Sequence, residues 1–301
     1  MNRTLFALRR LTTRLREIPG AVIFMEPFRT RLLIRDRTVV VPDFDGCLSL
    51  ELSLGGHMGS QIFWYGSYSR HILRVMDALL EPGMTVVDVG ANLGEITLVA
   101  ARRVGAAGRV LAFEPVDSIA DRLDRNVAMN DLFQVTVLRS GLSDQEGTAE
   151  IYTSLRPFHD HTHHEGLSSL YADEERDSRV QTITLTTLDA ACAEQGIGRL
   201  DLLKIDVEGA ELAVLRGGEK TIAAMRPWII VEVNRGTSRN AAVRPEQILE
   251  LLSAHGYRFF RIDRRQPLTE ITTETLGRFE NVLARPPGRI ARVLPASSTP
   301  G

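Results

Sequence analysis

The sequence predicts an α/β fold in which a doubly wound, mostly parallel sheet is covered by helices on both faces. From residue 85 onward, short apolar segments alternate with longer amphipathic ones, which is typical of parallel strands joined by crossover helices. The composition supports a globular protein, because 44% of the 301 residues are hydrophobic and 25% are charged. Such a sheet binds ligands beyond the carboxyl ends of its strands, so the residues that follow each predicted strand are the first candidates for a site.

An N-terminal α/β extension, which we place at residues 1–64, precedes the alternating region. Leucines at helical spacing predict a helix over residues 4–17, and apolar patterns predict strands over residues 31–41 and 47–54. Nine arginines against three acidic residues give residues 1–40 an excess of six positive charges. We interpret this arm as a solvated helix surface, and contact with an anionic surface or partner is the alternative.

The alternating region forms the second predicted domain, residues 65–290, and the residues from 291 to 301 form a flexible tail. A helix is expected over residues 69–80, before the first main strand, and an additional hairpin from residues 148–154 and 179–185. Further helices are expected near residues 95–102, 118–129 and 245–255, and another follows the strand at 201–205 and runs through residue 215. The main strands are predicted at residues 85–89, 109–113, 134–139, 201–205, 228–233, 257–262 and 281–284.

The turn after the first main strand carries the strongest binding signal in the sequence. Asp88 ends the apolar strand, and the turn before the next helix contains Gly90, Asn92 and Gly94. Glycines let a backbone approach a ligand closely, and the first amides of a helix point toward the same ligand. A nicotinamide-binding turn needs G-x-G-x-x-G, but Asn92 and Glu95 occupy its second and third glycine positions. The alternative is a tight turn in which Asp88 only caps the helix.

Two further strand ends are candidates for binding an adenosine group. Glu114 ends the second main strand, where dinucleotide-binding folds place an acidic side chain that accepts hydrogen bonds from ribose hydroxyls. Its alternative role is to cap the following helix. Leu142 follows the third main strand, where an apolar side chain would pack on the adenine ring, and Asp144 would accept from the adenine amino group. A type I turn explains the same residues equally well.

Taken together, these strand-end motifs resemble those of the FkbM-type family of class I S-adenosylmethionine-dependent methyltransferases, over about residues 65–285. The pair Arg226-Pro227, followed by an apolar strand that ends in Glu232, also matches. The resemblance implies a seven-stranded, Rossmann-like sheet whose last strand is antiparallel, and S-adenosyl-L-methionine as the cofactor, with its methionine part held by Asp88 and the glycine turn. It also implies methyl transfer to a hydroxyl of a sugar, glycan, polyketide or other natural product. The motifs occur in the family's order as D-V-G-A-N-L-G at 88–94, F-E-P at 113–115, G-L-S-D at 141–144 and L-K-I-D-V-E-G-A-E at 203–211.

Charged residues at the ends of the fourth and fifth main strands are the candidate catalytic groups. An alcohol acceptor must lose its proton, and Asp206 is the first candidate base, with Glu208 and Glu232 next. Lys204 would keep one of these carboxylates ionised, and a purely structural lysine is an equal alternative. Oxygen ligands from Asp206, Glu232 and Asn234 would suit Mg²⁺, which we do not favour because their spacing is generic. We therefore assign no metal ligand.

Histidines and tyrosines outside these motifs are further candidates. Residues 159–164 contain four histidines and an aspartate, and we interpret them as a polar loop rather than as a transition-metal site or an acceptor lid. Tyr65, Tyr68 and His71 lie upstream of the first main strand. These three residues either line an acceptor pocket or pack on the surface of the preceding helix.

The remaining features limit the partners of the protein. Two cysteines cannot form a disulfide framework, and no apolar run approaches the roughly 18 residues that a membrane span needs. The region after residue 40 is acidic and has no basic and aromatic platform, which disfavours nucleic acid as a substrate. We therefore expect a cytoplasmic enzyme that acts on a small-molecule or glycan acceptor, with its oligomeric state left open. The alternative functions are a non-catalytic domain that binds an adenosine cofactor or a partner, and a nicotinamide-dependent oxidoreductase.

Overall fold

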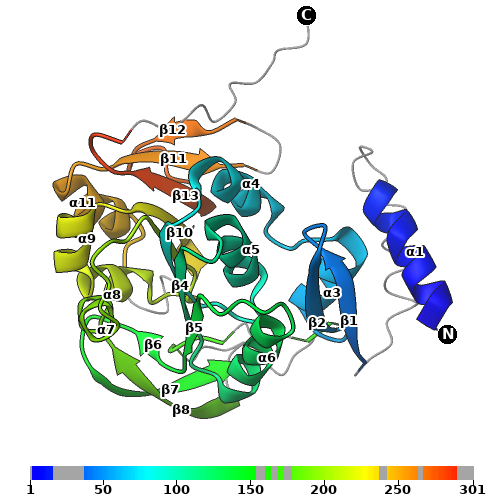
Figure 1. Cartoon of the computed structure of the whole chain (residues 1–301). Coiled ribbons are helices and arrows are strands. Elements are labelled where there is room, and N and C mark those ends of the chain that lie inside the picture. The colour runs from blue at the N-terminus through cyan, green and yellow to red at the C-terminus, as the bar shows by residue number, and fades with distance from the viewer. Residues whose placement is uncertain are drawn as a thin grey trace, which may run out of the picture.

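The computed structural model describes residues 2–15, 37–153, 160, 162–163, 168–171, 178–236, 243–263 and 267–289. A central sheet runs through the molecule with helices on both of its faces (Figure 1). Its strands follow the order β12-β11-β13-β10-β9-β3-β4-β5. They span Thr85–Val89 (β3), Arg109–Phe113 (β4), Val135–Leu138 (β5), Leu202–Ile205 (β9), Trp228–Asn234 (β10), Arg258–Ile262 (β11), Thr269–Ile271 (β12) and Phe279–Arg285 (β13).

The strand directions confirm the predicted doubly wound, mostly parallel fold. Strands β10, β9, β3, β4 and β5 run parallel to one another, and β13 lies antiparallel between β10 and β11. The residues that the structure describes form eight strands in this sheet, one more than the seven predicted. The additional strand is β12, a three-residue strand that pairs with the edge strand β11. Such a short segment carries too little alternation to be recognised in the sequence.

Alternation along the strands divides the core into two layers. Val86, Leu202 and Ile230 pack on one face of the sheet, whereas Val87 and Leu203 pack on the other. Because side chains alternate along a strand, Asp88 and Lys204 lie on the same face as Val86 and Leu202. The helices that share this first face are α4 (Arg70–Leu79), α5 (Glu95–Val104) and α6 (Asp117–Ala128). The second face is covered by α7 (Leu188–Glu194), α8 (Glu211–Arg216), α9 (Glu219–Met225) and α11 (Glu246–Ala254).

The N-terminal extension shares the core of the first face. Leu5, Val41 and Leu50 belong to the same buried cluster as Val86 and Leu98. The described part of the extension consists of α1 (Asn2–Leu15), the antiparallel strands β1 (Thr38–Phe44) and β2 (Leu48–Ser53), and the helix α3 (His57–Tyr65), which the sequence analysis did not predict. The predicted residues 16–17 of the first helix and 31–36 of the first strand lie outside the described residues.

A small second sheet covers the end of the molecule near β5 (Figure 1). It contains β6 (Gly141–Leu142), β7 (Gly147–Thr153) and β8 (Ser178–Thr186) in the order β6-β8-β7. Strands β7 and β8 are antiparallel and correspond to the predicted hairpin. The predicted tail, residues 291–301, lies outside the described residues. Among the helices that the structure describes, none is both long and apolar enough to span a bilayer.

Candidate functional site

The turn after β3 is held against the end of β9. Gly90 has a φ of +77°, and a Cβ atom at this position would lie 2.0 Å from the backbone oxygen of Asp206. The same two strand ends are joined by a hydrogen bond from the Asp206 amide to the Val89 carbonyl oxygen, 3.1 Å long. Gly94, with a φ of 102°, precedes α5 at a point where a Cβ atom would lie 2.7 Å from Leu123 of α6. Close approach to the backbone of Asp206 therefore requires glycine at position 90, and the positive φ favours glycine at position 94.

Glu114 links the ends of β3 and β4. Its carboxylate is 5% exposed and accepts hydrogen bonds from the amides of Asn92 (2.9 Å) and Val116 (3.0 Å). Burial raises the pKa of Glu114 to about 7, although the two amide hydrogen bonds oppose this shift. Asn92 itself has a φ of 51°, and its side-chain oxygen accepts from the Leu93 amide at 2.7 Å. The backbone of the turn is thus held by the Glu114 side chain from the end of β4 and by the side chain of Asn92 within the turn.

Beneath this turn, a buried ion pair joins β3 to β9. Asp88 and Lys204 are direct neighbours in the parallel register, and the Lys204 Nζ atom lies 3.5 Å from an Asp88 carboxylate oxygen. The other oxygen of Asp88 accepts from the Thr97 hydroxyl at 2.6 Å. Lys204 also donates to the Gly90 carbonyl oxygen at 3.1 Å and lies 3.6 Å from Asp206. Burial opposes the charge on Lys204, but Asp88 and Asp206 outweigh it and raise the pKa of Lys204.

A cleft with an empty volume of about 1030 Å³ opens at the carboxyl ends of β3, β4 and β9, and we call it the main cleft. Asp88, in β3, and Gly94, directly before α5, do not line the cleft. The other predicted site residues come together in the wall. They are Gly90, Asn92, Glu114, Leu142, Lys204, Asp206, Glu208 and Glu232.

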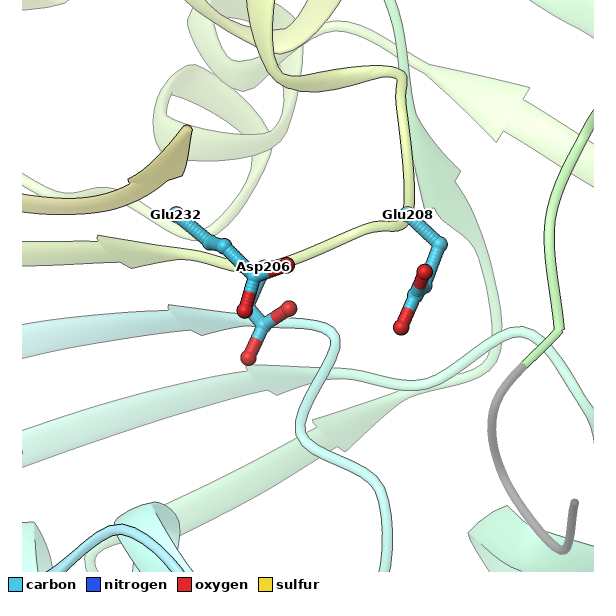
Figure 2. A group of neighbouring side chains, drawn as sticks. All are labelled: Asp206, Glu208 and Glu232. Atoms are coloured by element: carbon cyan, nitrogen blue, oxygen red, sulfur yellow. The ribbon is translucent and has the colours of Figure 1, made fainter. Parts of the chain in front are cut away.

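Three of these residues form a group that we call the carboxylate cluster: Asp206, Glu208 and Glu232. Figure 2 shows Glu232 coming from β10 and Asp206 and Glu208 from the segment after β9. One carboxylate oxygen from each lies within 4.8 Å of the others, so the cluster has the geometry to hold a cation. Burial, followed by repulsion from Asp206 and Glu208, raises the pKa of Glu232 to about 10. Burial and the neighbouring carboxylates therefore favour the protonated form of Glu232.

The structure groups Glu208, and not Asn234, with the two carboxylates that the sequence analysis considered for Mg²⁺. Asn234 is absent from the wall of the main cleft, and its amide oxygen accepts from the Gly236 amide at 2.9 Å. Glu208 adopts a φ of 55°, which is uncommon for a residue with a side chain. Its carbonyl oxygen accepts from the Ser169 hydroxyl at 2.7 Å.

Two buried glutamates shape the site, although the sequence analysis gave them no role. Glu95, at the start of α5, accepts from the amides of Tyr68 (2.6 Å) and Ser69 (3.0 Å). Glu211 accepts from the amide of Gly209 at 3.0 Å and thereby fixes the segment that carries Glu208. Burial raises the pKa of each glutamate to about 7. The sequence did contain a signal for both glutamates, because each closely follows a glycine turn. Backbone amides in such a turn can donate the hydrogen bonds that a buried carboxylate needs.

A second cavity, with an empty volume of about 900 Å³, adjoins the main cleft. Tyr68, Ser69, Asp206 and Glu232 line both spaces. Burial, with Asp206 and Glu232, raises the pKa of Tyr68 and keeps its hydroxyl protonated. Of the three residues considered for an acceptor pocket, Tyr68 and His71 line this cavity and Tyr65 does not.

The described part of the histidine-rich loop docks on the start of α3. The His163 amide donates to the Gly55 carbonyl oxygen at 2.9 Å, and the His57 amide donates to the His163 carbonyl oxygen at 3.0 Å. His57 Nδ1 also lies 3.0 Å from the Thr162 hydroxyl and 3.5 Å from Asp160. His159, His161 and His164 lie outside the described residues.

Comparison with known proteins relates the region that builds the main cleft to one family. Residues 88–259 match the family described as methyltransferase FkbM domain. The AMB antimetabolite synthetase AmbE of Pseudomonas aeruginosa is 32% identical over 247 residues, which cover 73% of this chain and 11% of AmbE. Methyltransferase sdnD of Sordaria araneosa is 35% identical over 194 residues, 57% of this chain and 73% of sdnD. The 2-O-methyltransferase NoeI of Sinorhizobium fredii is 26% identical over 190 residues, 60% of this chain and 75% of NoeI.

Proposed function

Because the chain belongs to the FkbM methyltransferase family, we propose that it transfers the methyl group of S-adenosyl-L-methionine to a hydroxyl of a small-molecule or glycan acceptor. The observation that carries this proposal is the main cleft, in which the glycine turn after β3 faces the carboxylate cluster. The similarity to a 2-O-methyltransferase supports an oxygen as the methyl acceptor.

The residues of the main cleft fit this cofactor. The backbone around Gly90 and Asn92 would hold the methionine part, and the buried Glu114 carboxylate would accept from the ribose hydroxyls. Leu142, which is 2% exposed, supplies an apolar surface for the adenine. Asp206 and Glu208 bring negative charge to the space where a sulfonium would lie. In this proposal Asp88 and Gly94 act indirectly, by fixing the turn.

The cofactor supplies a methyl group bound to a positively charged sulfur. Asp206 is the proposed base, which accepts the proton of the acceptor hydroxyl as the new oxygen–carbon bond forms and the carbon–sulfur bond breaks. Lys204 places a positive charge 3.6 Å from Asp206. The protonated Glu232 would donate a hydrogen bond to the acceptor oxygen and orient it. Such positioning of two reactants contributes a large part of the rate in a direct displacement.

We do not include a metal ion in this mechanism. The carboxylate cluster has the geometry for Mg²⁺, but its charge is already reduced by Lys204 and by the proton on Glu232. Glu208 is kept as the second candidate base, because it faces the same space as Asp206.

Calorimetry with S-adenosylmethionine, S-adenosylhomocysteine and NAD tests the proposal, followed by mass spectrometry of products from a panel of glycans and polyketides. We expect both sulfur nucleosides to bind, NAD to fail, and one acceptor to gain a methyl group. Binding of NAD instead of the sulfur nucleosides would favour an oxidoreductase. Cofactor binding without any methylated product across the panel would favour a non-catalytic domain.

A further inference from the structure

The second cavity meets the main cleft at the residues that would perform the chemistry. Asp206 and Glu232 line both spaces, so a molecule in the second cavity reaches these carboxyl groups without entering the main cleft. A displacement at carbon requires the acceptor oxygen and the leaving sulfur on opposite sides of the methyl group. Two adjoining spaces that share a wall at the proposed base offer separate places for the two reactants.

The wall of the second cavity offers several polar hydrogen-bonding groups. His71 of α4 and Asn281 of β13 form a side-chain pair, with Nε2 of His71 lying 3.1 Å from Nδ2 of Asn281. Tyr68 and Ser69 add two hydroxyl groups next to the carboxylate cluster. A few polar groups in the wall of a concave space are typical of small-molecule sites that recognise hydroxyl-bearing ligands.

The charges around the second cavity disfavour an anionic ligand. Arg261 is the one lysine or arginine in the described part of its wall, and its guanidinium is already engaged by both carboxylate oxygens of Glu280, at 2.6 and 2.8 Å. The Thr275 carbonyl oxygen accepts a further hydrogen bond from it at 3.1 Å. Asp263 and Asp206 add carboxyl groups to the same wall. The carboxylate or phosphate group of an anionic ligand would therefore meet negative charge in this wall without a matching cation.

An aromatic side chain stands at this cavity as well. Phe279, the first residue of β13, lines the cavity and is 56% exposed. A single exposed phenylalanine needs no explanation by itself, but one that borders a polar cavity supplies a flat apolar surface for a ring.

We infer that the second cavity is the acceptor site and that it selects an uncharged, hydroxylated ring over an anionic one. This inference rests on the proposed function, because the acceptor must reach Asp206 while the cofactor occupies the main cleft. It narrows the acceptor from any hydroxyl compound to neutral sugars and similar polyhydroxylated rings, and it disfavours uronic acids and sugar phosphates.

Binding of matched sugars tests the inference without requiring turnover. The probes are the methyl glycosides of glucose, galactose and mannose, each compared with its uronic acid, in saturation-transfer NMR on protein loaded with S-adenosylhomocysteine. Calorimetry on the same samples verifies that the sulfur nucleoside is bound. Phe279→Ala is the test variant. Phe133→Ala is its matched control, because Phe133 is 91% exposed and lines neither space.

We expect at least one neutral glycoside to bind about five-fold more tightly than its uronic acid, and Phe279→Ala to weaken that binding about five-fold while Phe133→Ala leaves it unchanged. The inference is overturned if uronic acids bind as well as the neutral sugars, if Phe279→Ala has no effect, or if no neutral sugar binds to the loaded protein. Failure of S-adenosylhomocysteine to bind would overturn the proposed function itself, and the calorimetry separates the two cases.

Discussion

Strand β9 has a carboxylate at each of its ends, and the two carboxylates differ in their exposure and in the number of neighbouring donors and cations. Asp201, just before the strand, is 1% exposed and accepts from the Thr85 amide (3.0 Å) and from Arg199 (2.9 Å). Arg289 lies 3.5 Å away as a further cation. Asp206, just after the strand, has a 32% exposed side chain and one cation, Lys204, at 3.6 Å.

The difference distinguishes a structural carboxylate from a reactive one. Asp201 is hydrogen-bonded to Arg199 and to the Thr85 amide at the start of β3. Its carboxylate therefore stabilises the contact between β9 and β3 and is not available to bind a ligand. Asp206 instead shares its space with Glu208, and these two carboxylates leave more negative charge than Lys204, which also pairs with Asp88, can balance. Groups with such unmatched charge in a cleft are candidates for chemistry.

The largest effect is expected from removing the charge at the reactive end. Asp206→Asn should lower kcat by about 100- to 10,000-fold, because the acceptor hydroxyl loses its proton acceptor. Turnover is measured with an acceptor identified by product mass spectrometry, and calorimetry verifies that the cofactor still binds. Retention of normal turnover in Asp206→Asn, together with loss of turnover in Glu208→Gln, would move the role of base to Glu208.

Removing the cation between the two strands should mainly affect stability. Lys204→Met leaves Asp88 fully buried without its ion-pair partner, and we expect the free energy of unfolding to fall by about 3–5 kcal/mol. Urea unfolding measures this change. Lys204→Arg is the control that keeps the charge, and normal turnover in this variant would argue against a dedicated role for lysine.

A smaller loss of stability is expected at the structural end of the strand. Asp201→Asn keeps the shape of the side chain but weakens its bonds to Arg199 and the Thr85 amide, so the free energy of unfolding should fall by about 1–3 kcal/mol. Turnover per folded molecule should not change. A loss of turnover comparable to that of Asp206→Asn would break the comparison between the two ends.

The pH dependence of stability sharpens the comparison at the reactive end. Burial and the neighbouring carboxylates raise the pKa of Glu232 from its ordinary value of 4.5 to about 10. Between these values the native protein holds a proton that the unfolded chain has released, so the contribution of Glu232 to stability decreases as the pH rises. Glu232→Gln should show a shallower decrease in unfolding free energy across this range. Identical pH profiles for the two proteins would contradict a buried, protonated Glu232.

The smallest effect is expected from removing divalent cations. Exhaustive chelation should change turnover by less than about two-fold, since Lys204 and the proton on Glu232 already reduce the charge of the carboxylate cluster. Addition of Mg²⁺ to the chelated protein is the control. A large loss that Mg²⁺ restores would show that the carboxylate cluster holds a metal ion.

The sequence predicted which residues lie at the sheet edge because apolar strands that end in charged or glycine residues are recognisable locally. This rule placed Gly90, Glu114 and Asp206 in one cleft. Alternation also put Lys204 on the same side of its strand as Asp206. Alternation did not predict the ion pair between Asp88 and Lys204. That contact depends on the register between β3 and β9, and the two residues are 116 positions apart in the sequence.

Other features depend on tertiary packing that no local pattern contains. Helices α3, α7 and α9 were missed because they are short and are stabilised by burial against the core. The second cavity combines His71 of α4 with Asn281 of β13, two residues 210 positions apart. Only the pairing of β13 between β10 and β11 brings them together.

Glu95 gives the two spaces a common support. It begins the helix that follows the glycine turn, and its carboxylate grips the backbone of Tyr68 and Ser69, which line both spaces. A shift of the glycine turn would therefore also move Tyr68 and Ser69 in the wall of the second cavity. The two spaces therefore share one structural support, the carboxylate of Glu95.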